Sequence, residues 1–277
     1  MDAKTIEALR FFSRILHQEG RRFVLIGATV PQVVFDSREG DLGPGSRETK
    51  DVDALAEVNS WSDFARLSER LLREGFRQGR AAHEFSFGDE VRIDLIPFGP
   101  ALIEQDKLSW PDGGAIMNAC GLEEALDCAR EEEIADRFTL PMVTIPGLVL
   151  TKIIAYLDRP EERTHDLIDI LYCFEHYETK PPASRRFDLA ESQVEDRPIN
   201  YDEAGAYLLG VEVAALARPN SLAAVRRFVG TISDEFARPI SQILANEKRL
   251  VDNYTRRSVL YRLFQVFGAG IKQTTSR

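Results

Sequence analysis

Two carboxylates on one short apolar strand do most to limit how this chain can fold. Residues 50–58 are typical of a strand, where side chains alternate between faces, so Asp51 and Asp53 point the same way. The two charges repel each other and must be solvent-exposed, protonated or bridged by a cation. An exposed polar edge is one interpretation, but the apolar residues 54–56 indicate that the strand enters a core. The other is a seat for Mg²⁺, which prefers hard oxygen ligands.

A third aspartate, Asp94, interrupts the apolar strand expected at residues 91–97. Arg92 and Asp94 share one face of that strand, while its apolar residues take the other. Because an unpaired buried carboxylate is costly, Asp94 needs a cation or a basic neighbour. The residues leave two interpretations open, a bound cation or a surface ion pair with Arg92.

Strands and helices alternate over the first hundred residues, which is typical of an α/β or α+β fold. Hydrophobic spacing and turn residues predict helices at 4–19, 28–35 and 60–74 and strands at 23–26, 50–58, 83–87 and 91–97. The strand pattern then fades, and helices are expected at 121–133, 146–157, 164–177 and over most of 202–271. We therefore expect an α+β fold, a mixed sheet with flanking helices followed by a helical C-terminal domain.

The composition excludes several classes of protein. The 277 residues include 44% hydrophobic and 29% charged side chains, so a wholly disordered chain is excluded. No apolar run approaches the ~18 residues of a membrane helix, and the N-terminal segment lacks the pattern of a secretory signal. Cys120, Cys128 and Cys173 are odd in number and lack metal-ligand spacing. We expect a cytoplasmic protein in a reducing compartment, without membrane association.

The net charge of −10 is unevenly distributed. An acidic chain argues against a bulk nucleic-acid coat, but residues 201–277 carry 11 basic and 7 acidic side chains. A solvated helical surface is the simpler interpretation of this excess. The other is a local contact with a polyanion such as tRNA, at Arg249, Arg256, Arg257 and Arg262.

A tight turn at Gly27, Ala28 and Thr29 leads from the first expected strand into a helix. A helix N-terminus offers free backbone N–H groups and a partial positive charge, which suits a phosphate. Taken alone, the glycine is equally consistent with a plain strand-to-helix turn.

Taken in order, these elements resemble the DNA polymerase β-type nucleotidyltransferase superfamily, which has a Gly-small turn, an Asp-x-Asp strand and a lone Asp on a later strand. Its minimal, AbiEii-type toxin branch is the more similar. The residues that carry this closer resemblance are Arg47-x-Thr49-x-Asp51-x-Asp53, Ile93-Asp94-Leu95, Lys152-x-x-Ala155 and His165-Asp166-Leu167-x-Asp169.

Such enzymes bind a nucleoside triphosphate with two magnesium ions and release pyrophosphate. The resemblance implies that Asp51 and Asp53 hold both Mg²⁺ ions. It implies that Asp94 completes the site of one ion, where the acceptor hydroxyl loses its proton. The nucleotide-binding residues that it implies are Gly27, Ala28, Thr29, Arg47 and Thr49.

The resemblance also gives roles to the second half of the chain. Lys152 is expected to point to the nucleotide phosphates, and Asp166 to orient Lys152 or the acceptor. A surface ion pair is the simpler interpretation of these two residues. The expected regions are a nucleotidyltransferase α/β core at 1–100, a helical continuation completing the active-site cleft at 101–180, and a helical C-terminal region at 200–277.

The function implied is transfer of a nucleoside monophosphate to a hydroxyl of RNA such as tRNA, of a protein or of a small molecule. The branch also implies a toxin with a cognate antitoxin. The alternative is a catalytically weak or inactive nucleotidyltransferase-fold binding protein. Ala28 favours that alternative, because the family usually has serine or glycine there, whereas the three aspartates favour the enzyme.

Overall fold

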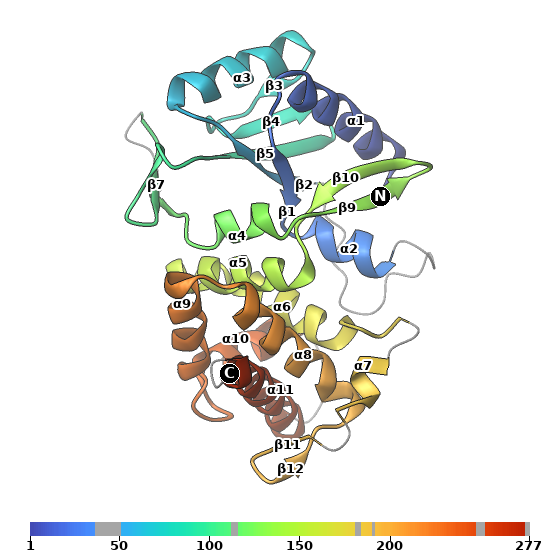
Figure 1. Cartoon of the computed structure of the whole chain (residues 1–277), viewed down its shortest axis with the longest axis vertical. Helices are drawn as coiled ribbons and strands as arrows, with labels where there is room; N and C mark the ends of the chain where they lie inside the picture. The colour runs from blue at the N-terminus through green and yellow to red at the C-terminus, as the bar shows by residue number, and fades with distance from the viewer. Residues whose placement is uncertain (37–50, 112–115, 181–183, 190–191, 248–252, 275–277) are drawn as a thin grey trace. The chain divides into compact units, whose positions relative to one another are not determined.

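The computed structural model describes residues 1–36, 51–111, 116–180, 184–189, 192–247 and 253–274. Its internal contacts divide the chain into two compact units, Met1–Thr144 and Ile145–Arg277. They are called unit 1 and unit 2 below, and each is described by itself (Figure 1).

Unit 1 is built on a seven-stranded mixed sheet with the order β3-β4-β5-β2-β1-β10-β9. Strands β2 and β5 are parallel, as are β1 and β10, and the other neighbours are antiparallel. The strands are β1 Phe23–Ile26, β2 Asp51–Glu57, β3 Arg77–Gln78, β4 Glu84–Phe87, β5 Val91–Phe98, β9 Arg130–Ala135 and β10 Phe138–Met142.

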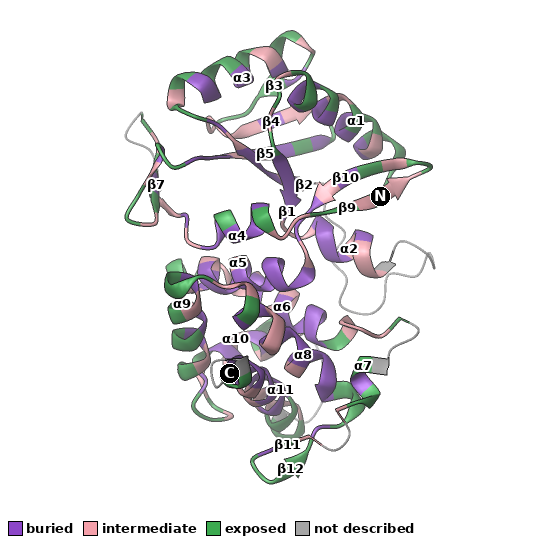
Figure 2. Cartoon of the chain, in the orientation of Figure 1, coloured by how far each residue is buried: buried purple, intermediate pink, exposed green. Residues whose placement is uncertain are grey.

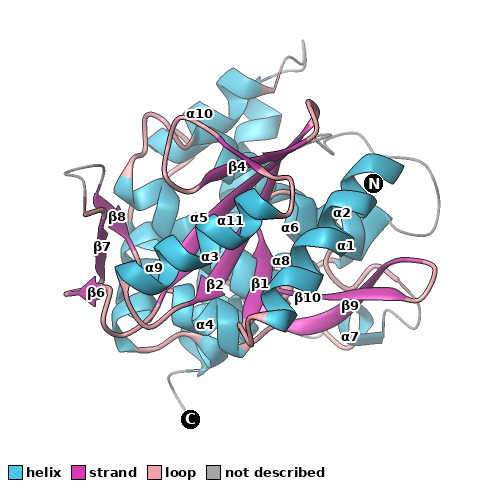
Figure 3. Cartoon of the chain, turned by 90° about the horizontal axis from the view of Figure 1, so that it is seen from above, coloured by secondary structure: helices cyan, strands magenta, loops and turns pink. Residues whose placement is uncertain are grey.

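Four helices and a small second sheet complete the described part of unit 1. Helices α1 and α3 lie on one face of the large sheet (Figures 1 and 3), and each begins at a side-chain cap, Asp2 or Ser60. The elements are α1 Ala3–Gln18, α2 Thr29–Asp36, α3 Trp61–Arg73 and α4 Leu122–Asp127, with β6 Ile103–Glu104, β7 Lys107–Ser109 and β8 Ile116–Asn118.

The core of unit 1 lies around its central strands, which Figure 2 shows as largely buried. All four residues of β1 are buried, as expected for an apolar run flanked by β2 and β10. Phe12 of α1 is fully buried and packs edge-on against Phe23 and Phe76. The sheet therefore gives β2 and β5 a rigid support.

Unit 2 is helical, with one short hairpin. Helices α8 and α11 approach closely, since a Cβ atom on Gly210 would lie 2.2 Å from the Phe267 carbonyl oxygen. The elements are α5 Ile145–Asp158, α6 Thr164–His176, α7 Ser184–Phe187, β11 Gln193–Val194, β12 Arg197–Pro198, α8 Tyr201–Leu216, α9 Pro219–Gly230, α10 Arg238–Asn246 and α11 Asn253–Thr274.

The expected α+β class is confirmed, with a mixed sheet first and helices after it. The helix expected at 121–133 is wrong beyond Asp127, because residues 130–135 form β9 and pair with β10. These two strands belong to unit 1, which extends to Thr144. Among the described residues, no helix combines the length and apolar character that crossing a membrane requires.

Candidate functional site

The register of β2 and β5 brings the predicted carboxylates onto one face of the sheet. Asp53 lies directly opposite Asp94 on the neighbouring parallel strand, and Asp51 lies opposite Arg92. Paired residues in adjacent strands project to the same face, and so do residues two apart along one strand. The three aspartates predicted from the sequence therefore share one face of unit 1.

Arg92 forms an ion pair with Asp51. The sequence leaves open an ion pair between Arg92 and Asp94, and the structure shows Arg92 on Asp51 instead. The Arg92 Nε donates to Asp51 Oδ1 at 3.0 Å, and its Nη2 donates to Oδ2 at 2.6 Å. This two-point contact engages both oxygens of the Asp51 carboxylate. Both side chains are about half exposed, at 53% for Arg92 and 47% for Asp51.

Asp94 is the least satisfied of the three carboxylates. Its Oδ1 atom is buried and finds no hydrogen-bond partner in the described part of the chain. Burial raises the pKa of Asp94, and the nearby Glu84 and Asp51 raise it further, although His83 and Arg92 oppose the shift. A cation placed at Oδ1 would remove the cost of this unpaired atom.

Gly27 leaves room for the Asp53 carboxylate. It adopts a φ of +79°, which favours glycine, and a Cβ atom there would lie 1.9 Å from Asp53 Oδ2. The turn it forms leads into α2 through Ala28. The buried Thr29 hydroxyl donates to the Asp51 carbonyl oxygen at 3.3 Å, so it serves the start of β2.

The donor set of this face fits Mg²⁺ in its chemistry. Asp51, Asp53 and Asp94 offer carboxylate oxygens, and the buried Oδ1 of Asp94 lacks a partner within the described residues. Among all residues that the structure describes, no three His, Cys, Asp or Glu side chains are grouped closely enough to hold a metal ion. Arg47 and Thr49, two of the predicted nucleotide contacts, lie outside the described residues.

Unit 2 contains a second polar cluster, on α5 and α6. Lys152 Nζ lies 3.0 Å from Asp166 Oδ1 and 2.5 Å from Asp169 Oδ2. Arg163 adds a second cation, with its Nε 2.6 Å from Asp166 Oδ2. The side chains of Lys152 and Asp166 are 7% and 0% exposed, so the interpretation as a surface ion pair is wrong.

The members of this cluster stabilise one another's charged forms. Burial disfavours the charged form of Lys152, but Asp169 and Asp166 outweigh it and raise the pKa of Lys152. Burial likewise opposes ionisation of Asp166, but Lys152 and Arg163 hold the pKa of Asp166 below its usual value. Sequence reasoning did not include Arg163, although its position three residues before Asp166 was the available signal.

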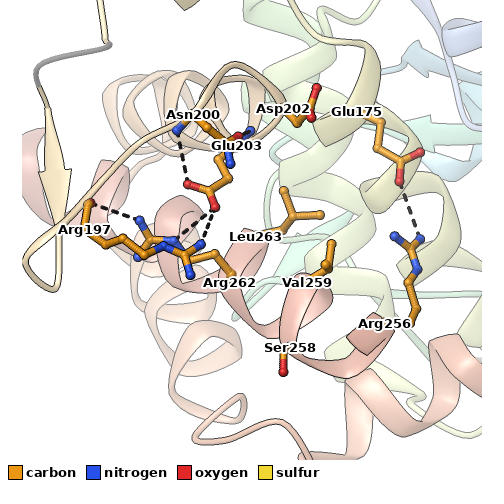
Figure 4. Close-up of a pocket in the computed structure, with 10 residues that line it drawn as sticks. All are labelled: Glu175, Arg197, Asn200, Asp202, Glu203, Arg256, Ser258, Val259, Arg262 and Leu263. Atoms are coloured by element: carbon orange, nitrogen blue, oxygen red, sulfur yellow. Dashed lines mark hydrogen bonds and ion pairs between the residues drawn. The ribbon is translucent and has the colours of Figure 1, made fainter. Parts of the chain in front are cut away.

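A cavity of about 530 Å³ in unit 2 is lined by Arg256 and Arg262, two of the arginines expected to contact a polyanion (Figure 4). Its arginines already have partners. Arg256 pairs with Glu247 at 2.5 Å, and Arg197 pairs with Glu203 at 2.6 Å. Arg262 is 6% exposed and donates to the backbone carbonyl oxygens of Val194, Arg197 and Pro198.

The residue-level expectation for RNA is wrong for Arg262 and stays a prediction for the other arginines. Arg262 is a structural residue that ties the β11–β12 hairpin to α11, and it is too buried to meet a phosphate backbone. Arg257 donates to the Glu235 carbonyl oxygen and lies over the Phe236 ring. Arg249 lies outside the described residues.

A comparison with protein families agrees with the motifs. A model of the family described as "Nucleotidyl transferase AbiEii toxin, Type IV TA system" matches residues 10–246. No curated protein sequence matches the chain. Among solved structures, the chain is similar to ANT(2'')-Ia, described as an antibiotic-resistance factor, at 15% identity and a TM-score of 0.39, with 62% of this chain and 84% of that chain covered. It is also similar to JHP933 from Helicobacter pylori, at 12% identity and a TM-score of 0.42, with 100% and 97% covered.

Proposed function

Because this chain belongs to the AbiEii family of nucleotidyltransferase toxins from type IV toxin–antitoxin systems, we propose that it transfers a nucleoside monophosphate from a nucleoside triphosphate to a hydroxyl acceptor. Mg²⁺ would be held by Asp51, Asp53 and Asp94. The observation that carries the proposal is the pairing of Asp53 with Asp94 in register, with the Oδ1 atom of Asp94 buried and unpartnered among the described residues.

The metal ions, when bound, supply positive charge that stabilises the attacking and leaving oxygens of an in-line displacement. The acceptor oxygen forms a bond to the α-phosphorus, the bond from that phosphorus to the bridging oxygen breaks, and pyrophosphate leaves. Asp94 takes the acceptor's proton at a carboxylate oxygen.

The turn at Gly27 would bind the β- and γ-phosphates through backbone N–H groups at the start of α2. Support for this role comes from its position, since Gly27 lies directly against Asp53. Ala28 has no hydroxyl, and the Thr29 hydroxyl is turned to the Asp51 carbonyl oxygen, so the backbone would make these contacts. Arg47 and Thr49 would add side-chain contacts to the nucleotide.

Lys152 would contact the nucleotide phosphates, and Asp166 would orient it. The 3.0 Å contact between Lys152 Nζ and Asp166 Oδ1 supports the second role. Asp166 is fully buried, so it acts through Lys152 and is a positioning residue.

The acceptor would be an RNA such as tRNA, a protein or a small molecule, and a cognate antitoxin would be the protein partner. The test is incubation with each α-labelled nucleoside triphosphate, Mg²⁺ and either total RNA or RNA-free lysate. We expect a labelled product with the unaltered chain and none with Asp53→Asn. Asp89→Asn, which changes an exposed carboxylate in the turn between β4 and β5, is the matched control. Equal labelling by the Asp53 variant would overturn the proposal.

A further inference from the structure

Arg92 is a positive charge built into the face that we assign to metal and nucleotide. Its guanidinium contacts both oxygens of Asp51, at 3.0 Å and 2.6 Å. The contact follows from strand register, because Arg92 lies directly opposite Asp51 and two residues before Asp94. Along this face, the Arg92–Asp51 ion pair is followed by Asp53 and Asp94, which lie opposite each other on β2 and β5.

This arrangement creates a competition for Asp51. A metal ion that uses Asp51 must take at least one oxygen from the Arg92 guanidinium. The ion pair is about half exposed on both sides, so solvent screens it and a divalent cation can reach Asp51. The positive charge of Arg92 therefore offsets the charge of Asp51 beside Asp53 and Asp94. A metal ion that binds Asp51 can still displace the guanidinium.

The displaced guanidinium needs another anion. Glu84, which faces Asp94 across β4 and β5, already accepts hydrogen bonds from the backbone N–H groups of Arg80 and Ala81. A phosphate offers a better partner, because its oxygens match the planar, two-point geometry of a guanidinium. The nucleoside triphosphate brings such oxygens to this face if the proposed function is correct.

We propose that Arg92 is a binding residue that passes from Asp51 to the phosphates of the nucleotide when metal takes Asp51. The inference rests on the proposed function and adds to it a coupling between the binding of metal and the binding of nucleotide. Without metal, Arg92 is occupied and contributes nothing to nucleotide affinity. With metal, it is available to phosphate, so each ligand strengthens binding of the other by the same factor.

The test measures binding, without turnover. Mn²⁺ binding is followed by electron paramagnetic resonance, and the α,β-methylene analogues of the four nucleoside triphosphates are titrated by calorimetry with and without Mn²⁺. The variants are Arg92→Gln, Arg92→Lys and Asp53→Asn. Arg77→Gln is the matched control, since Arg77 forms a 3.0 Å ion pair with Asp89 on exposed side chains.

Arg92→Gln should weaken analogue binding about 5- to 10-fold with Mn²⁺ present and leave it unchanged without Mn²⁺. It should also bind Mn²⁺ alone more tightly than the unaltered chain, because the Arg92 guanidinium no longer competes with the ion for Asp51. Arg92→Lys, which keeps the charge without the fork, should recover part of the coupling.

An equal loss of analogue affinity with and without Mn²⁺ would overturn the inference, because it would show a plain electrostatic effect of Arg92. Unchanged affinity under both conditions would overturn it as well. A failure of the proposed function looks different. In that case Asp53→Asn binds Mn²⁺ as tightly as the unaltered chain, which overturns the metal site and the handover together.

Discussion

Asp94 on β5 and Asp166 on α6 both hold carboxylate oxygens away from solvent, in units 1 and 2, but they have different neighbours. Asp166 is met by Lys152 at 3.0 Å and by Arg163 at 2.6 Å. The Oδ1 atom of Asp94 meets no hydrogen-bond donor in the described part of the chain. The pKa shifts follow the surroundings, lowered for Asp166 and raised for Asp94.

The difference separates a carboxylate whose oxygens are satisfied by cations from one with a buried oxygen that lacks a hydrogen-bond partner among the described residues. Native proteins satisfy nearly all buried polar atoms, so an unsatisfied one in a well-packed sheet requires an explanation. Functional sites are where such exceptions are expected. The unpartnered oxygen of Asp94 supports the ligand chemistry proposed for its face, whereas the ion pairs of Asp166 indicate that it stabilises unit 2.

The largest effect is expected in the cluster of unit 2. Lys152→Met leaves Asp166 and Asp169 without their shared cation and should lower the free energy of unfolding by about 3–5 kcal/mol. Urea denaturation of the full chain measures this loss. Arg159→Met, at an exposed arginine beside the end of α5, should change stability by less than about 0.5 kcal/mol. Equal stability of the two variants would contradict a structural role for Lys152.

The next effect depends on pH. Asp166→Asn should lower the free energy of unfolding by about 2–3 kcal/mol near neutral pH, because Lys152 and Arg163 lose a charged hydrogen-bond acceptor. The pKa of Asp166 is lowered from its ordinary 3.8, so its stabilising contribution is present above that value and is lost as pH falls through the folded-state pKa. The stability difference from the unaltered chain should therefore shrink below pH 3.8. A difference that is constant down to pH 3 would contradict the assignment.

The sequence was enough to predict the elements that carry the carboxylates. Period-two patterns and turn residues mark β2 and β5 closely, because local spacing decides which side chains share a strand face. The polar run Glu131–Glu133 was misread as helix because its β pairing is with β10, a contact that local periodicity does not record.

The partner of Arg92 could not be predicted for a similar reason. Asp94 is its near neighbour on the same strand, whereas Asp51 lies 41 residues away in sequence and becomes adjacent only through the parallel register of β2 and β5. Burial of Lys152 was also hidden, because a lysine on a helix is usually exposed. Which side chains meet is decided by packing between elements, and the sequence pattern sets only the elements.

A smaller effect is expected at Gly27. Gly27→Ala should destabilise by about 2 kcal/mol, since it strains a positive φ and places a methyl group against Asp53 Oδ2. Gly88→Ala is the matched control, because Gly88 has a φ of +62° with no atom within 4 Å of an added Cβ. Thermal unfolding compares the two, and the Mn²⁺ affinity should fall only for Gly27→Ala. Equal effects of both variants would show that Gly27 serves backbone strain alone.

The smallest effect has the opposite sign. Asp94→Asn should raise the free energy of unfolding by about 1 kcal/mol at pH 7 in EDTA, because it removes a charge that burial disfavours. The pKa of Asp94 is raised above 3.8, so the ionised form destabilises the fold at high pH, and this penalty disappears as pH falls through the folded-state pKa. The advantage of the variant should therefore vanish by pH 3.8, where the unaltered side chain is protonated. Saturating Mg²⁺ should reverse the order at pH 7, since a bound ion stabilises only the chain that keeps the carboxylate. A variant less stable than the unaltered chain in EDTA would make Asp94 a satisfied structural residue like Asp166.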